Sequence, residues 1–296
     1  MRIANLNGRA HLLSGPGAID IARASGGRFG PDPMDLFAHW DAFRTWVRTD
    51  GVHPAAPYRR EDLGAPVPRP GQVVAIGLDY AEHAAETGLE AAKGMPSVFT
   101  KFTSSLTGPA GTVHLTGPSV DWKVELVVSI GKEAHHVAAA DAWEHVAGVM
   151  VGQDFSDRDV QMSGTPPQFS LGKSYPGFGP TGPALVSLDE IAPDTPLRLR
   201  CWVNDELVQD GSALTLAANA ARGATSSRSG YCSSREHSRS SRARAASSLC
   251  AVGTTYRSAY FATASSRCRS SVSGRVRPTA LSAASSPGSP RTRARM

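Results

Sequence analysis

The stretch that decides the fold is Asp121-Trp122-Lys123-Val124-Glu125-Leu126-Val127-Val128-Ser129-Ile130-Gly131. Its apolar run is typical of a strand that is buried on both faces and ends at a glycine. Lys123 and Glu125 stand two residues apart, so both side chains point to the same face of this strand. A carboxylate in such surroundings needs a partner, which can be a cation, a lysine or a metal ion. From spacing alone, a salt bridge at the strand end is the simpler interpretation.

Outward from this strand, the sequence contains further strand-like runs separated by turns that contain Gly or Pro. The runs cover residues 73–76, 97–99, 147–151 and 197–203. Helical patterns between them are short, at residues 81–86 and 138–145. We therefore predict a β-rich α+β domain over residues 68–212.

The first 67 residues have a different pattern. Short alternating stretches at residues 2–4 and 10–13 predict strands, and residues 33–49 predict a helix. The helix prediction rests on apolar side chains at three- and four-residue steps, namely Leu36, Phe37, Trp40, Phe43 and Trp46. The proline-rich segment 65–71 cannot sustain a helix and is typical of a linker. We predict a small N-terminal α+β domain over residues 1–67.

The composition changes abruptly after Ser212. Residues 213–296 hold 14 of the 31 basic residues and one of the 26 acidic residues, so they carry +13, whereas residues 1–212 carry 17 − 25 = −8. Two interpretations of this Ser/Arg/Ala-rich tail remain open. A disordered tail could bind RNA or phosphate by charge alone. A GC-rich gene read out of frame would also explain the scattered Cys, Tyr and Phe residues. We favour the second interpretation and expect no nucleic-acid partner.

The sequence also argues against a membrane or secreted protein. Its apolar runs are far shorter than the roughly 20 residues that cross a bilayer, and its start lacks the apolar stretch of a signal peptide. The four cysteines lack CxxC spacing, so they predict neither a zinc site nor a disulfide framework. We therefore expect a cytoplasmic protein with no membrane partner.

Two further motifs carry groups that could do chemistry. In the segment 77–86, His83 and Glu86 stand three residues apart, so on a helical turn the carboxylate can orient the imidazole as a general base for water. The alternative without a functional role is a surface contact between the two side chains. In the segment 152–161, three carboxylates and an arginine follow an apolar strand, which is usually a solvated turn. Asp154 lies nearest the strand end and is a candidate oxygen ligand for Mg²⁺.

Taken together, these motifs resemble the fumarylacetoacetate hydrolase family. The resemblance runs in order from about Val73 to Ser212 through GLDYxxHxxE, PSVFxK, DWxVELxxxIGK, GQDxSxRDxQ and LGKSY. It implies a mixed β-roll catalytic domain, often preceded by a small N-terminal domain and usually dimeric. It also implies Mg²⁺ or Mn²⁺ chelated by a small 2-oxo or diketo acid substrate, which is hydrolysed at a C–C bond, decarboxylated or isomerised through an enolate.

The resemblance also implies roles for single residues. Glu125 and Asp154 match metal carboxylates, and Asp79 is a candidate third ligand. His83 and Glu86 match the water-activating pair, and Lys173 matches a lysine at the substrate or oxyanion. Four further positions are expected at the substrate: Tyr80, Lys101, Arg158 and Gln161.

Two departures from the family pattern leave an alternative open. Lys123 stands where the family usually has a glutamate ligand, which places a positive charge beside the expected dication. The tail also lacks the family's closing Gly-Asp-x-Ile-x-Thr-Gly-Thr-Pro segment, so we expect unpaired sheet edges and a marginally stable chain. The alternative is therefore a catalytically impaired or non-catalytic member in which Lys123 acts as a built-in cation.

Overall fold

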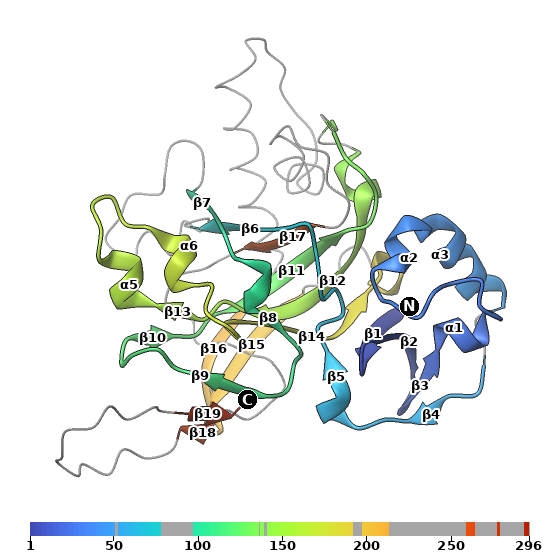
Figure 1. Cartoon of the computed structure of the whole chain (residues 1–296), viewed down its shortest axis with the longest axis horizontal. Helices are drawn as coiled ribbons and strands as arrows, with labels where there is room; N and C mark the ends of the chain where they lie inside the picture. The colour runs from blue at the N-terminus through green and yellow to red at the C-terminus, as the bar shows by residue number, and fades with distance from the viewer. Residues whose placement is uncertain are drawn as a thin grey trace.

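Figure 1 shows the computed structural model of the chain. It describes residues 1–50, 53–77, 97–135, 137–138, 141–191, 197–212, 259–263, 277–278 and 293–295. The helical patch expected at residues 81–86 lies outside these residues. In the patch expected at 138–145, the described residues include a 3-10 helix, Ala142–His145.

Twelve strands of the described chain form one mixed sheet (Figure 1). Along its main path the order is β4 (Ala56–Pro57), β3 (Gly17–Asp20), β2 (Arg9–Ser14), β1 (Arg2–Leu6), β14 (Gly179–Val186), β12 (Val146–Gln153), β11 (Val124–Ile130), β17 (Ala259–Thr263), β6 (Gln72–Gly77) and β7 (Ser97–Thr100). Strands β5 (Leu63–Gly64) and β8 (Leu106–Thr107) pair beside this path. The β-rich fold predicted from the sequence is confirmed.

Smaller elements flank this sheet. The strands pair as β10 (Val120–Asp121) with β13 (Ser156–Asp157), β15 (Arg198–Val203) with β16 (Glu206–Ser212), and β9 (Thr112–His114) with β19 (Arg293–Arg295), which also pairs β18 (Arg277–Pro278). The helices are α1 (Ile21–Ala24), α2 (Asp35–Ala38), α3 (Trp40–Thr49), α5 (Arg158–Met162) and α6 (Phe169–Gly172).

Strand β11 lies where the apolar run predicted it and forms the middle of the sheet. It pairs antiparallel with β12 from Val124↔Gln153 to Ile130↔Val146. Most of its side chains are buried, including Glu125, because both faces of the strand are covered. The two strands therefore carry the motifs around Lys123 and Asp154 to the same end of the sheet.

The N-terminal segment joins this sheet instead of standing apart from it. Strand β1 pairs with β14, so one sheet runs through both segments. The predicted helix over residues 33–49 forms as α2 and α3 with a break at His39, whose backbone is not helical. The aromatic side chains of α3 lie in a core with residues from both segments, including Val127 and Leu185.

Part of the segment after residue 212 enters the sheet. Strand β17 pairs antiparallel with β11 and parallel with β6. We expected unpaired sheet edges from the missing family motif, and at this place the expectation is wrong, because Ala259–Thr263 supplies the backbone ladder between β6 and β11. The sequence did not predict this strand, because the Ser/Arg bias of the whole tail outweighs the locally apolar composition of residues 259–263.

Candidate active site

The centre of the candidate site is the buried carboxylate of Asp154, which directly follows β12. Its backbone N–H donates to the carbonyl of Lys123 at 2.9 Å, which fixes the two residues side by side at the end of the β11–β12 ladder. The side chain is 1% exposed. A buried ion of this kind must be paired, and Asp154 is paired by three lysines.

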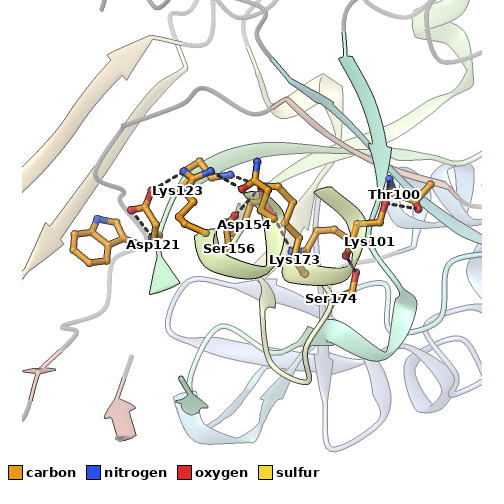
Figure 2. Close-up of polar contacts among 12 residues, drawn as sticks. Thr100, Lys101, Asp121, Lys123, Asp154, Ser156, Lys173 and Ser174 are labelled. Carbon is orange, nitrogen blue, oxygen red and sulfur yellow. Dashed lines mark hydrogen bonds and ion pairs between the residues drawn. The ribbon is translucent and has the colours of Figure 1, made fainter. Parts of the chain in front are cut away.

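The three lysines come from three different elements and converge on one carboxylate (Figure 2). Lys101 follows β7 and places Nζ 2.8 Å from Asp154 Oδ1. Lys123 precedes β11 and places Nζ 2.6 Å from Asp154 Oδ2. Lys173 follows α6 and places Nζ 2.5 Å from the same Oδ2. All three side chains are at most 3% exposed, so the ion pairs are dry.

Hydrogen bonds between α6 and the strand β7 hold Lys173 in this position. The Ser170 hydroxyl accepts from the Thr100 N–H at 3.2 Å, and the Ser174 hydroxyl accepts from the Phe102 N–H at 2.9 Å. The carbonyl of Lys173 in turn accepts a hydrogen bond from Lys101 Nζ. Two of the lysines are therefore fixed to each other as well as to Asp154.

Burial and charge shift the pKa values of this cluster in opposite directions. Burial lowers the pKa of Lys101 and lowers that of Lys173 well below the usual range, although Asp154 opposes both shifts. Burial alone would raise the pKa of Asp154, but Lys101, Lys123 and Lys173 hold it well below its usual range. Asp154 is therefore the fixed anion of the cluster.

Glu125 lies on the strand beside this cluster and behaves differently. It is 1% exposed, and its Oε1 has no hydrogen-bond partner among the described residues. Burial raises its pKa well above the usual range despite the neighbouring lysine charges. A buried carboxyl with an unused oxygen is one that can donate or accept a proton or receive a ligand.

Arg158 and Gln161, both expected at the substrate, lie together on α5. Arg158 Nη2 lies 2.6 Å from Asp121 Oδ2, and its Nη1 donates to Gln161 Oε1 at 2.8 Å. Arg158 is thus held by protein groups on two sides. The structure brings this pair close to the start of β11.

Of the residues singled out from the sequence, Lys101, Lys123, Glu125, Asp154 and Lys173 meet in one buried place. Asp79, Tyr80, His83 and Glu86 lie outside the described residues. The expected substrate role of Lys101 and the expected catalytic role of Lys173 remain predictions, since both ammonium groups point at Asp154 (Figure 2).

Two residues of this place were missed from the sequence. Ser156 accepts a hydrogen bond from Lys173 Nζ at 2.7 Å, and the Phe99 ring lies 4.7 Å below the same ammonium group. The spacing of Ser156, two residues after Asp154 in a strand-like segment, was a usable signal for the same face. The proximity of Phe99 comes from tertiary packing and left no local signal.

The donor set tests whether Mg²⁺ or Mn²⁺ fits this place. Within the described part of the chain, no group of three His, Cys, Asp or Glu side chains could hold a metal ion. The available carboxylates are Glu125 and Asp154, and both oxygens of Asp154 already receive ammonium groups. A dication about 4 Å from one ammonium group is repelled by several kcal/mol at an effective dielectric near 20. These residues therefore do not fit a dication while Lys123 holds Asp154.

Residues 72–222 match the family described as "Fumarylacetoacetate (FAA) hydrolase C-terminal". The chain belongs to the fumarylacetoacetate hydrolase family. This confirms the resemblance drawn from the motifs.

The relatives of this chain have names from several reaction classes. Human mitochondrial oxaloacetate tautomerase FAHD2A is 44% identical over 161 residues, which cover 54% of this chain and 51% of the relative. The chain thus spans about half the length of the curated relatives it matches. A Fumarylacetoacetate hydrolase domain-containing protein 2 homolog from Dictyostelium discoideum is 38% identical over 197 residues, covering 62% of this chain and 64% of that protein.

Solved structures agree with this fold. A protein from Mycobacterium smegmatis assigned the name HpcE is 49% identical, with a TM-score of 0.68 over 73% of this chain and 76% of that one. Maleylpyruvate hydrolase from Sphingobium sp. SYK-6, solved with manganese(II) and pyruvate, is 23% identical, with a TM-score of 0.67 over 93% of this chain and 92% of that one. The second likeness shows the fold alone.

No helix in the described ranges is long and apolar enough to cross a membrane. The expected cytoplasmic location stays a prediction, and the human relative carries a mitochondrial name.

Proposed function

We propose that this chain is an enzyme that acts on a small 2-oxo or diketo acid through its enolate. The observation that carries the proposal is the buried cluster of Lys101, Lys123 and Lys173 around the single carboxylate of Asp154. Loss of a proton beside a 2-oxo group places negative charge on the oxo oxygen. Fixed cations in a dry site stabilise such a developing charge far better than water does.

In this proposal Lys173 stabilises the charge that develops on the substrate oxygen. Burial lowers the pKa of its ammonium group, so the group gives up a proton more readily than an exposed lysine does. Ser156 and Asp154 fix its Nζ in position. Asp154 and Lys101 then serve to hold the local charge constant while the substrate's charge changes.

Two reaction types are compatible with an enolate. Tautomerisation, named for the human relative, only moves a proton between carbon and oxygen. C–C hydrolysis also adds water across the bond, so one carbonyl becomes a carboxylic acid and the other fragment leaves as an enolate that takes up a proton. For hydrolysis, His83 and Glu86 are the proposed pair that activates the water.

The sequence also predicts Mg²⁺ or Mn²⁺ at Glu125 and Asp154, with Asp79 as a candidate third ligand. This metal-dependent form of the proposal requires Lys123 Nζ to leave Asp154 Oδ2, from which it lies 2.6 Å away. In that form the ion would polarise the 2-oxo group as a Lewis acid. An assay with EDTA and with added Mg²⁺ separates the metal-dependent form of the proposal from the metal-free form. Only the metal-dependent form predicts that EDTA abolishes activity and that Mg²⁺ restores it.

The direct test of the activity is the rate of enol-to-keto conversion of oxaloacetate, followed by ultraviolet absorbance, together with hydrolysis of an acylpyruvate. We expect the purified chain to accelerate at least one of them and Lys173→Met to lower its kcat by about 100-fold or more, the loss typical of removing one oxyanion donor. The control is Lys132→Met, whose lysine pairs with Asp41 on the surface.

Rates equal to buffer for a folded wild-type chain would support the non-catalytic alternative. The observation that favours this alternative is Lys123, whose ammonium already neutralises Asp154. We further propose that the protein is cytoplasmic and forms a homodimer. Sedimentation of the purified chain would test the homodimer, and fractionation of the cells that make it would test the location.

A further inference from the structure

Lys123 is a buried residue of the site and not a charged residue of the surface. Its side chain is 3% exposed, and its Nζ lies 2.6 Å from Asp154 Oδ2. The backbone adds a second tie, because the Lys123 carbonyl accepts the N–H of Asp154. The backbone of Lys123 is thus fixed at the end of the β11–β12 ladder, and its head group is fixed by Asp154.

The charges at this place are those of an anion site. Among the described residues, three ammonium groups face two carboxyl groups, Glu125 and Asp154. With all three lysines protonated, the cluster keeps an excess of positive charge even when both carboxyl groups are ionised. An anion is the ligand that such a cluster attracts, and a dication is repelled by it.

The free hydrogen-bonding capacity agrees with this charge count. Each ammonium group has three donors. Lys123 uses one on Asp154 among the contacts of the described chain, whereas Lys101 and Lys173 each make two. Lys123 therefore has the most donors left for a ligand, and Glu125 Oε1 beside it is an unused acceptor.

We propose that the Lys123 ammonium takes the place of a divalent cation, so that this centre binds a small 2-oxo carboxylate through lysines without a metal ion. The proposal deepens the proposed function, because it names what holds the substrate at that same site. Lys123 supplies the charge and the hydrogen bonds to the substrate oxygens, while Asp154 holds the ammonium group in position. The centre thus keeps a cation that no chelator can remove.

The first test is Mn²⁺ binding, measured by the loss of the free-ion electron paramagnetic resonance signal in the full chain. We expect wild type and Lys132→Glu to bind Mn²⁺ only in the millimolar range, and Lys123→Glu to bind it at least about 100-fold more tightly. Lys132→Glu is the matched control, because it makes the same change of charge at a partly exposed lysine after β11. Micromolar binding by wild type, with no gain in Lys123→Glu, would overturn the proposal.

The second test keeps the proposal falsifiable if Lys123→Glu does not fold. Pyruvate binding to the full chain is measured by calorimetry in the presence of EDTA, for wild type and for Lys123→Met, which keeps the apolar stem without the charge. We expect wild type to bind and Lys123→Met to bind at least about 10-fold more weakly. Binding by wild type only after Mn²⁺ is added, or equal binding by the two chains, would overturn the proposal.

These measurements do not depend on turnover. A chain that binds pyruvate in EDTA but converts no substrate refutes the proposed function and leaves this inference intact. A chain that turns over substrate only with Mn²⁺ present refutes this inference and supports the enzyme.

Discussion

At the scale of single residues, the chemistry of this chain is set by one pair of positions on β11. Lys123 and Glu125 are both buried, yet their surroundings differ. Lys123 is held by Asp154, whereas Oε1 of Glu125 has no partner in the described part of the chain. A carboxyl of this kind is stable in the folded protein mainly in its neutral form.

The pH dependence of stability should expose Glu125. Because burial raises its folded-state pKa above the ordinary value of 4.5, its contribution to stability is fully present below about pH 4.5 and is lost as the pH rises through the folded-state pKa. In Glu125→Gln this loss is absent. The variant should therefore gain stability relative to wild type between pH 5 and pH 8, as measured by urea unfolding.

The contribution of Asp154 to stability changes with pH in the opposite direction to that of Glu125. Its pKa is held low by the lysines, so its contribution is present above its ordinary pKa and is lost only as the pH falls into the acid range. Wild type and Glu125→Gln both contain Asp154, so this residue does not affect the difference between their free energies of unfolding. A difference between Glu125→Gln and wild type that stays constant with pH would contradict the assignment of Glu125.

At the scale of elements, the local patterns of the sequence predicted positions well where a segment is buried on both faces. The apolar run 124–130 predicted β11 with its observed bounds, because both faces of that strand are covered. The pattern over 33–49 predicted one helix, and the structure divides it at His39, where no proline or glycine signals the break.

The buried face of α3 offers a direct stability test. Phe43 is fully buried and contacts the rings of Phe29, Trp40 and Trp46. Phe43→Ala leaves a cavity in this core and should lower the free energy of unfolding by about 3–5 kcal/mol. Thr45→Ala, on the exposed face of the same helix, should change it by no more than about 0.5 kcal/mol.

Urea unfolding of the two variants measures this difference. Equal losses in both would mean that α3 is not packed as described.

The site was only partly predictable for a related reason. Lys123, Glu125 and Asp154 lie in motifs at the ends of predicted strands, and the family resemblance predicted that Glu125 and Asp154 meet at one centre with Lys123 beside them. The contact of Lys101 with Lys173 and Asp154 depends on how α6 lies against β7, which no local pattern encodes. The sequence therefore predicted the residue types at the centre, but not that three lysines would share one carboxylate.

At the scale of the whole molecule, the sheet depends on a segment that composition alone would dismiss. Residues 259–263 form β17 between β6 and β11, in a region whose overall bias is Ser and Arg. Whether that region is genuine or out of frame stays a prediction. Resequencing the gene from about codon 195 and translating all three frames tests it, because an out-of-frame origin requires the family's Thr-Gly-Thr-Pro segment in another frame.

The role of β17 can be tested on the chain itself. Ala262 pairs with Val127 on one side and Ala75 on the other. Proline there removes a backbone N–H from the middle of the sheet, where an acceptor left without a partner costs about 1–3 kcal/mol. Ala262→Pro should therefore lower the melting temperature by several degrees, whereas Ala262→Ser, which keeps the N–H, should not.

Equal melting temperatures for Ala262→Pro and Ala262→Ser would show that β17 does not carry the ladder. Calorimetry of both variants beside wild type makes the comparison.

The position of β17 also sets an order of events during synthesis. Strands β6 and β11 emerge from the ribosome long before residues 259–263, and each must wait for its neighbour with an open backbone edge. Pairings between parts of the chain so distant in sequence form slowly, and waiting edges are sites of aggregation. The nascent chain should therefore depend on chaperones until residues 259–263 have been made. Cells that express the chain at low temperature should accordingly yield more folded protein.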